Sequence, residues 1–218
     1  MTQTATVHVM RHGQVHNPDG LLYGRLPGFG LSDLGHQMAA RMAEYWSDKP
    51  LTHLRVSPLQ RAKETLAPTA ALFPHLEVVE DERVIEADNK FQGMTFGRDN
   101  KALRNPKMFW HMRNPLIPSW GEPYTEIAAR MRAAIRDAGE AAGDGGQALV
   151  VSHQLSIWTA RMDAEGRPFA HDPRKRECTL CSVTSFTLRD GLVTAVDYAE
   201  PAADLLPVKT GRRWKVGT

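Results

Sequence analysis

Segments typical of β-strands alternate with segments typical of helices along this chain, and that alternation limits its fold more than any other feature. The strand-like segments are short runs rich in β-branched and apolar residues at 6–10, 52–56, 76–79 and 148–151. Parallel strands need long crossover connections, which helices usually supply. The pattern therefore predicts an α/β fold, a three-layer sandwich in which helices cover both faces of a mostly parallel central sheet.

The expected helices have recognisable starts and ends. Ser32 can cap the first helix, and Lys49-Pro50 ends it. Ser57-Pro58 is expected to open the second helix, because proline is tolerated in a first turn, and Arg61 would then lie one turn into it. Further helices are predicted over residues 122–142 and 154–162.

The last part of the chain predicts an antiparallel edge for the sheet. Residues 182–188 and 192–198 form two alternating strands that meet at Asp190-Gly191, a dipeptide typical of hairpin turns. Cys178 and Cys181 precede this hairpin. One C-x-x-C pair lacks the second pair that a structural zinc site needs, so we expect two buried residues at the start of a strand.

One domain is the simplest organisation for this chain. Because it has 218 residues and 42% hydrophobic content, residues 1–200 can bury a single full core. The segment at about 87–121 is rich in charge, Pro, Gly and Asn, which predicts an inserted, lid-like excursion. Residues 201–218 are expected to form a weakly ordered, basic C-terminal tail with Arg212, Arg213 and Lys215.

Composition argues against several classes of partner. Lysine and arginine number 27 against 25 acidic residues, and a net charge of +2 gives no field suited to nucleic acid. We find no charged leader with an apolar core and no apolar stretch as long as a membrane span. With the sparing use of cysteine, this predicts a cytoplasmic protein without nucleic-acid or membrane partners. Whether two copies form a homodimer is left open.

The residues with the clearest chemistry fall at the carboxyl ends of predicted strands, where ligands of parallel sheets bind. Arg11-His12 follows the first strand, and His153 follows the run 148–151. A phosphoryl group in transfer needs fixed cations and donors around it, and an arginine fork matches two phosphate oxygens at once. Arg11, Arg61 and His153 therefore indicate a phosphate pocket, with His12 attacking through an unprotonated ring nitrogen.

Each of these residues also has an ordinary structural explanation. Arg-His-Gly occurs by chance, Arg61 alone would be a solvated helix residue, and His153 alone could be a core histidine. Their joint occurrence, in this order and at these places in the α/β pattern, favours function.

Four segments between residues 7 and 154 together resemble a known family: VHVMRHGQVHN, GRLPGFGLSDLGHQMA, VSPLQRAKETLAP and VVSHQ. They are similar to motifs of the histidine phosphatase superfamily, which includes the cofactor-dependent phosphoglycerate mutases and many small-molecule phosphatases. The resemblance implies that His12 becomes phosphorylated, that its neighbours above form the phosphate pocket, and that neither a metal nor a bound cofactor takes part. On the substrate side we expect five residues: Gln14, Asn17, Gly24, Arg113 and Gln154.

The family also uses an acidic residue as proton donor, and Glu86 is our candidate. It follows the third predicted strand, where the family's Arg-Leu-x-Glu pattern falls, and Phe91-Gln92-Gly93 resembles the end of that motif. An alkoxide is a poor leaving group, so a carboxylic acid must protonate it and then, as carboxylate, activate water. Glu86 could instead be a surface carboxylate, and the rival acids are Glu82, Asp88 and Glu122.

The sequence departs from the family pattern at three places. Asn89-Lys90 stands where a glycine is expected, and Gln154 follows His153 where the family generally has glycine. In Trp110-His111-Met112-Arg113, only Arg113 remains of the adjacent arginines with which the mutases hold a substrate carboxylate. This segment and Trp120 are expected to shape the substrate pocket. The pair of arginines that binds a substrate carboxylate in the mutases is incomplete in this sequence.

These features favour a phosphomonoesterase that cleaves a small phosphorylated metabolite through a phosphohistidine at His12. A mutase that returns the phosphoryl group to its substrate is the first alternative, because it would use the same residues. A phosphate- or phosphopeptide-binding module without turnover is the second alternative, because binding needs only Arg11, Arg61 and His153. The sequence does not name the substrate.

Overall fold

The computed structural model of the protein describes residues 3–94 and 121–206, and within them a six-stranded sheet forms the centre of the fold. The strand order is β3-β2-β4-β1-β5-β6. The first four strands in this order are parallel, and β5 and β6 are antiparallel to their neighbours β1 and β5. The strands are β1 (Thr4–Arg11), β2 (Leu51–Val56), β3 (Val78–Glu80), β4 (Gly146–Ser152), β5 (Val183–Arg189) and β6 (Leu192–Ala199).

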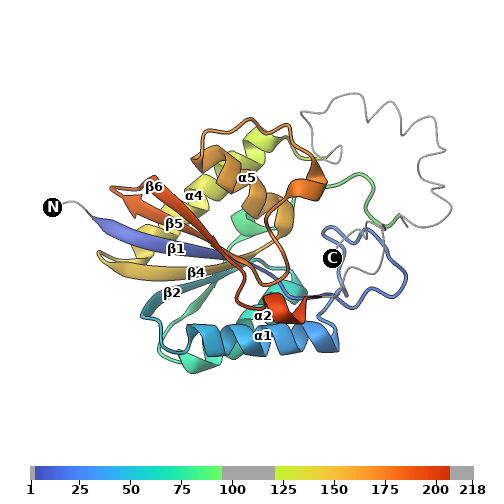
Figure 1. The fold of residues 1–218 in the computed structure, drawn as a ribbon, viewed down its shortest axis with the longest axis horizontal. Coiled ribbons are helices and arrows are strands. Elements are labelled where there is room, and N and C mark those ends of the chain that lie inside the picture. Colours follow the sequence, from blue (N-terminus) through green and yellow to red (C-terminus); the bar gives the residue numbers. More distant parts are fainter. Residues whose placement is uncertain (1–2, 95–120, 207–218) are drawn as a thin grey trace.

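Helices cover both faces of this sheet, which confirms the predicted three-layer α/β sandwich. Figure 1 shows α1 (Asp33–Trp46) and α2 (Gln60–Leu72) on one face, and α4 (Tyr124–Ala142) and α5 (Gln154–Ala164) on the other. Short 3-10 turns at Glu82–Val84, Pro173–Lys175 and Ala203–Leu205 complete the described elements.

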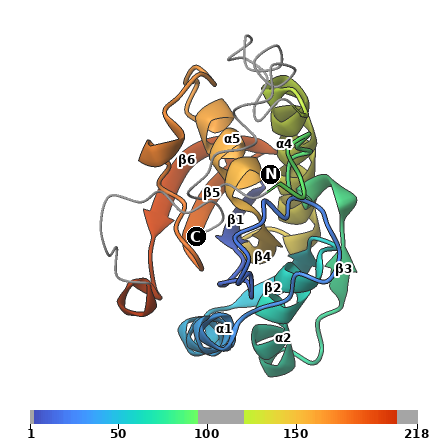
Figure 2. The ribbon, with the colours of Figure 1, turned by 90° about the vertical axis from the view of Figure 1, so that its right-hand side faces the viewer.

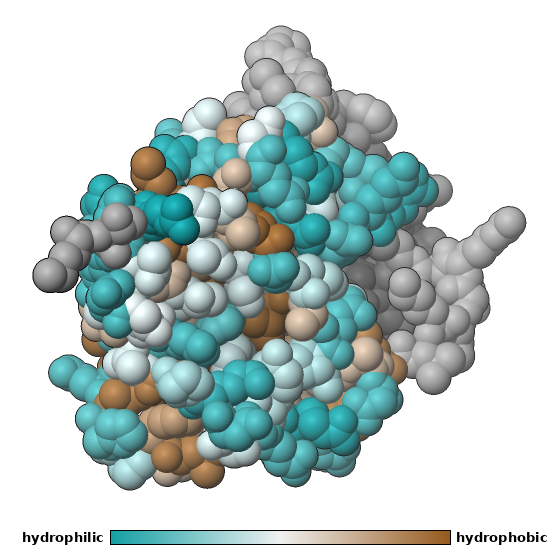
Figure 3. All heavy atoms as spheres, turned by 60° about the vertical axis from the view of Figure 1, so that its left-hand side comes forward, coloured by the Kyte–Doolittle hydropathy of each residue, from teal (hydrophilic) through white to brown (hydrophobic). Residues whose placement is uncertain are grey.

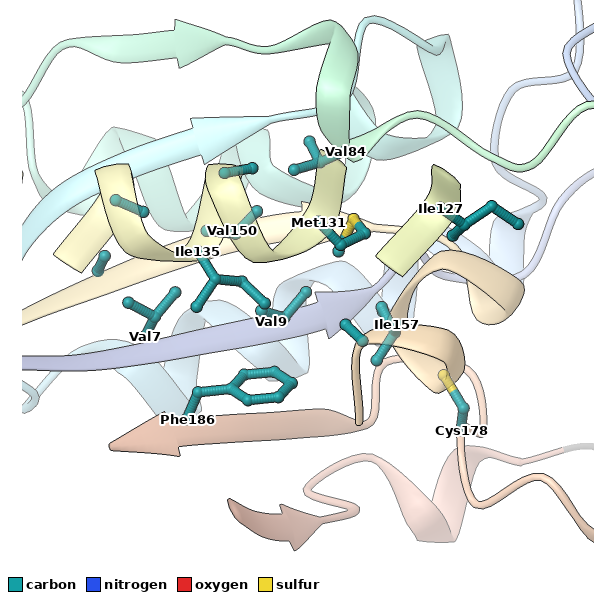
Figure 4. Close-up of a cluster of buried hydrophobic side chains, with 14 of the residues drawn as sticks. Val7, Val9, Val84, Ile127, Met131, Ile135, Val150, Ile157, Cys178 and Phe186 are labelled. Carbon is teal, nitrogen blue, oxygen red and sulfur yellow. The ribbon is translucent and has the colours of Figure 1, made fainter. Parts of the chain in front are cut away.

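The alternation of side chains along each strand divides the core into two clusters. Val7 and Val9 of β1 face α4, where Ile135 and other apolar side chains bury them (Figure 4). Met10 points the other way and packs among buried residues such as Trp46 of α1. Because β1 and β4 at the centre of the sheet are largely buried on both faces, the sheet is held from both sides and its carboxyl edge is fixed in space.

The predicted start of the first helix is correct, and the predicted start of the second is not. Ser32 caps α1 as predicted, since its Oγ accepts a hydrogen bond from the Gly35 backbone N–H at 3.1 Å. The predicted start of the second helix at Ser57-Pro58 is wrong, because α2 begins at Gln60. The Ser57 N–H donates to the Val151 carbonyl at 3.0 Å and extends the β2–β4 ladder, so the chain cannot yet turn into a helix.

The closing hairpin forms where it was predicted. Asp190 and Gly191 both have positive φ, 51° and 74°, as a two-residue hairpin turn requires. Cys178 and Cys181 are buried and unpaired just before β5, as expected, and burial raises the pKa of their thiols to about 11 and about 12. Both cysteines therefore stay protonated and act as core residues.

The predicted tail differs from the structure at its beginning. Ala202 is buried in the core, Leu205 and Leu206 pack against it, and Asp204 forms an ion pair with Arg41 of α1 at 2.8 Å. Residues 201–206 therefore belong to the folded unit because their apolar side chains cover the edge of the core. The basic residues Arg212, Arg213 and Lys215 lie outside the described residues, as does most of the predicted lid-like segment.

Few large apolar side chains are exposed among the residues that the structure describes. On the face shown in Figure 3, brown apolar residues lie in separate groups among teal hydrophilic ones. The large apolar side chains exposed in the described ranges are Leu72, Val78 and Leu192, and such single exposures are ordinary. Within the same ranges, no helix is long and apolar enough to cross a membrane.

Candidate active site

Two histidines meet at the carboxyl edge of the sheet, the edge that faces the viewer in Figure 2. β1 and β4 are neighbouring parallel strands with Arg11 opposite Ser152, so His12 and His153 leave the sheet side by side. Their ring centroids are 5.1 Å apart, and both residues are almost completely buried. The strand register therefore brings together two residues that are distant in the sequence.

His12 is held in the form that a nucleophile needs. Its Nδ1 lies 2.8 Å from the Gly13 carbonyl oxygen, which can only accept, so Nδ1 carries the proton and Nε2 keeps its lone pair. Burial lowers the pKa of His12 well below its ordinary value, and the charges of Arg61 and Arg11 lower it further. The ring is neutral at physiological pH, and Nε2 is ready to attack an electrophile.

Arg11 and Arg61 bring two buried positive charges to this histidine. Arg11 Nη1 donates to the Cys178 carbonyl at 2.8 Å, and Arg61 Nη2 donates to the Gly24 carbonyl at 2.7 Å. Neither has a carboxylate within 4.0 Å among the described residues, and the Nε of each is buried without a partner there. Buried cations of this kind are costly unless an anion joins them, so the pair is built to receive one.

His153 completes the cluster as a neutral donor. Ser57 Oγ lies 2.7 Å from its Nε2 and accepts a hydrogen bond from the Leu59 N–H at 3.4 Å, which lets the serine hydroxyl donate to Nε2. The proton of the ring then sits on Nδ1, which is buried and has no partner among the described residues. Burial, followed by the charge of Arg61, lowers the pKa of His153 well below its usual range.

A cleft of about 130 Å³ opens beside this cluster. The first residues of α5, Gln154 and Leu155, belong to its wall, and a helix N-terminus carries partial positive charge. Among the described residues the lining consists of Arg11, His12, Leu21, Leu22, Tyr23, Gly24, Glu86, Ala87, Asp88, Asn89, Gln154, Leu155 and Arg176.

Glu86 brings a carboxylate into the same cleft. Its side chain is half-buried, and its Oε1 accepts a hydrogen bond from the Ala87 N–H at 2.9 Å. Its backbone is held in place by Arg25, because the Glu86 carbonyl oxygen accepts a hydrogen bond from Arg25 Nε at 2.7 Å. No arginine or lysine of the described ranges approaches the Glu86 carboxylate within 4.0 Å, so the carboxylate is not held in an ion pair there.

The rival acids are placed less favourably. Glu122 forms ion pairs with Arg25 at 3.0 Å and with Arg130 at 2.6 Å, which commits both of its oxygens to structure. Glu82 is exposed and does not line the cleft. Asp88 lines the cleft but is exposed, so Glu86 is the candidate acid that is partly buried and also lines the cleft with His12.

Comparison with known proteins agrees with this geometry. The family model for the histidine phosphatase superfamily (branch 1) matches residues 7–201. The chain belongs to the histidine phosphatase superfamily. Members of this family are phosphatases or phosphotransferases, and the chain is accordingly a phosphotransfer enzyme of that kind.

Individual relatives extend the likeness over most of the chain. An uncharacterised Mycobacterium tuberculosis protein, Rv0525, is 47% identical over 93% of this chain and 100% of its own length. Phosphoglycerate mutase-like protein 4 of Arabidopsis thaliana is 31% identical over 86% of this chain and 81% of its own. The structure of phosphoserine phosphatase from Entamoeba histolytica, solved with 3-phosphoglyceric acid, has a TM-score of 0.73 at 18% identity, covering 93% of this chain and 100% of that one.

The substrate-side residues of this histidine phosphatase fall into three groups. Gly24 and Gln154 line the cleft. Gln14 and Asn17 do not: Gln14 Oε1 accepts from Ser32 Oγ at 2.7 Å, and the Asn17 amide makes two hydrogen bonds with the Leu21 backbone at 2.8 and 3.0 Å. Arg113, the residues 110–112 and Trp120 lie outside the described residues.

Three residues of the site were not anticipated from the sequence. Ser57 binds His153, the Tyr23 ring lies 4.8 Å from the Arg61 guanidinium, and Arg176 lines the cleft. Ser57 stands in the VSPLQR motif and could have been found there. Arg176 lies in the charged run 174–177, a pattern that usually indicates a solvated loop, so no signal in the sequence marked it.

Proposed function

We propose that this histidine phosphatase is a metal-independent phosphomonoesterase that hydrolyses a small phosphorylated metabolite through a phosphohistidine at His12. The observation that carries the proposal is the neutral His12, with Nε2 unprotonated, between two buried arginines that have no carboxylate partner in the described part of the chain. Fixed cations of this kind stabilise the charge on a phosphoryl group in transfer.

In the first step, Nε2 of His12 forms a bond to phosphorus while the bond between phosphorus and the leaving oxygen breaks. Glu86 gives its proton to that oxygen, so an alcohol rather than an alkoxide departs. Arg11, Arg61 and His153 hold the phosphoryl oxygens during the transfer. The proton on Nδ1 stays in its hydrogen bond to the Gly13 carbonyl, which stabilises the positive charge that the phosphorylated ring acquires.

In the second step, water attacks phosphorus and the phosphorus–nitrogen bond breaks. The Glu86 carboxylate takes a proton from the water, inorganic phosphate leaves, and His12 returns to its neutral form. The same residues would serve a mutase if an acceptor hydroxyl replaced water. Water is the acceptor favoured by the sequence, because the paired arginines that mutases use for a substrate carboxylate are reduced to Arg113.

The decisive experiment measures phosphate release and phosphoglycerate isomerisation side by side, across a panel of phosphomonoesters in the presence of a chelator. We expect hydrolysis in chelator and acid-labile phosphate on the protein after denaturing quench. His12→Ala should lose both, with a fall in kcat of about 10⁴-fold or more, as expected for removal of a nucleophile. His36→Ala, which changes an exposed histidine of α1, is the matched control and should behave like the parent.

Three other outcomes would replace the proposal. Isomerisation faster than hydrolysis would make the protein a mutase. Activity that chelator abolishes and an added metal restores would contradict the metal-independent route. Tight phosphate binding with no acid-labile phosphate, and equal binding by His12→Ala, would indicate a binding module.

A further inference from the structure

Arginines that are not paired with a carboxylate are rare in the described part of this protein, and they are not randomly placed. Most arginines there have an acidic partner within 4.0 Å, for example Arg55 with Asp81 and Arg161 with Glu165. The exceptions within residues 3–94 and 121–206 are Arg11, Arg61, Arg176 and Arg189. Arg189 is exposed to solvent. The other three are wholly or partly buried, and all of them lie at the active-site cleft.

Arg176 is aimed into this cleft by neutral groups. Its Nε donates to Nε2 of His171 at 2.8 Å, and His171 Nδ1 in turn donates to the Phe169 carbonyl at 2.6 Å. Tyr124 is a second hydrogen-bond partner of its side chain. Because His171 must accept at Nε2, its ring is neutral, so these contacts orient the guanidinium without cancelling its charge.

The guanidinium of Arg176 shares the cleft with a second arginine and with a carboxylate. Arg11 and Arg176 line the same cleft as Glu86, and Arg176 is close enough for the Glu86 charge to influence it, although the two do not form an ion pair within 4.0 Å. Burial lowers the pKa of Arg176, which shows that its environment disfavours the charge. A second anion in the cleft would offset that cost.

We infer that Arg176 is the specificity-determining residue for a second anionic group on the substrate, so that the enzyme takes phosphomonoesters that also carry a carboxylate or a second phosphate. The inference rests on the proposed function, since the reacting phosphate occupies the cluster of His12, Arg11 and Arg61. Arg176 then supplies, from the loop before β5, a guanidinium fork for the second oxyanion.

The test uses binding, so that it does not depend on turnover. Three non-hydrolysable ligands differ only in the group at the far end of a three-carbon chain: propylphosphonate, 4-phosphonobutanoate and propane-1,3-bisphosphonate. We expect calorimetry on the wild-type protein to show tighter binding of the ligands with a second anion, by about 10-fold or more for a charge-assisted contact. The carboxylate and bisphosphonate arms show which anion the site prefers.

Arg176→Gln should remove this preference and leave the Kd for propylphosphonate within about 3-fold of the parent value. Arg176→Lys should keep part of it, since a point charge remains without the fork. Arg174→Gln is the matched control, because Arg174 lies in the same loop but is exposed and paired with Asp172 at 2.7 Å. The control variant should bind all three ligands as the parent does.

Two results would overturn the inference. Equal affinity of the wild-type protein for all three ligands would show that no second anion is recognised. An Arg176→Gln variant that weakens all three equally, or that shifts the pH profile of turnover for every substrate, would show that Arg176 acts through Glu86 or the fold. Failure of hydrolysis and of histidine phosphorylation would instead reject the proposed function, whatever the binding series shows.

Discussion

Arg55 on β2 and Arg61 on α2 are six residues apart and almost equally buried, with exposed fractions of 6% and 1%, yet their surroundings are opposite. Arg55 donates to Asp81 at 2.6 Å, and Asp81 also binds Arg83, which reaches Asp137 of α4. We call Arg55, Asp81, Arg83 and Asp137 the paired cluster. Its charges are matched inside the protein, and it ties β2 to the segment after β3 and to α4.

The second region is the unpaired cluster of Arg11, Arg61 and Glu86. Within the part of the chain that the structure describes, none of these three has an oppositely charged partner within 4.0 Å. Removing one partner of a buried ion pair destabilises the fold because the other charge is left uncompensated, whereas a buried charge that has no partner favours binding of an external ion. The difference predicts which arginine affects stability and which affects activity.

Replacing each of the two arginines with an uncharged residue should have the largest effects. One variant should lose activity, and the other should lose stability. Arg61→Met should lower kcat/KM by about 10³-fold, because a transition-state cation is lost, while the free energy of unfolding stays the same or rises. Arg55→Met should leave kcat/KM within a few-fold and destabilise by about 2 kcal/mol, because Asp81 keeps only Arg83. Urea unfolding and steady-state kinetics on both variants check this. Loss of stability in Arg61→Met with unchanged activity would contradict the assignment.

Glu86 should show the next largest effect, and the effect should depend on the leaving group. Glu86→Gln cannot protonate an alkoxide, so kcat for an alkyl phosphate should fall by about 10²–10³-fold. For p-nitrophenyl phosphate, whose leaving group needs no proton, phosphorylation of His12 should slow by only about 10-fold or less. Single-turnover kinetics on both substrates measures this contrast, and Asp88→Asn is the control from the same cleft. An equal loss on both substrates would show that Glu86 is not the acid.

A smaller effect should come from the contacts that hold Glu86 in place. Glu122 binds Arg25, which donates to the Glu86 carbonyl, and Arg130, which donates to the Ile85 carbonyl at 2.9 Å. Glu122→Gln should therefore lower kcat by about 10-fold, with little change in KM, because a displaced acid slows chemistry more than binding.

The control for this positioning role is Glu126→Gln, an exposed residue in the first turn of α4 that should behave like the parent. The leaving-group dependence separates positioning from a general structural loss. If Glu122 acts through Glu86, the deficit should be greater for the alkyl phosphate than for p-nitrophenyl phosphate. A deficit that is equal for both, with a lower Tm, would indicate a structural role only.

The two histidines beside the unpaired cluster were predictable, because both follow strand ends. His12 and His153 come directly after β1 and β4, and the rule that ligands bind at the carboxyl edge of a parallel sheet places both at one site. That β1 and β4 are neighbours could not be predicted, since strand order depends on packing of the whole sheet. The identity of Arg61 came from its motif, although the start of α2 was misplaced.

Residues whose role depends on distant contacts were not predictable. Arg176 sits in a charged loop, and only His171 and Tyr124, which the fold brings to it, turn its side chain toward the cleft. The start of the C-terminal tail was wrong for a similar reason, because the burial of Ala202 depends on a surface that α1 and the sheet create together. Local patterns do not contain such information.

The smallest predicted effect is on the pH dependence of stability. It comes from His12, the neutral histidine next to the arginines of the unpaired cluster. Burial and the two arginines hold the pKa of His12 well below that of an unfolded histidine, near 6.5. As the pH falls below about 6.5, the unfolded chain takes up a proton at this position and the native protein does not. The free energy of unfolding must therefore fall with pH, by up to about 1.4 kcal/mol per pH unit for this group.

His12→Asn removes the titrating ring, so the variant should lose less stability than the parent between pH 7 and pH 5.5. Urea unfolding at several pH values measures both slopes, and His36→Asn on the exposed face of α1 serves as control. His153 has the same sign of shift and is expected to keep part of the dependence in the variant. If the two slopes were identical, the buried histidine would be charged in the native protein, and the unpaired cluster could not hold it as a nucleophile.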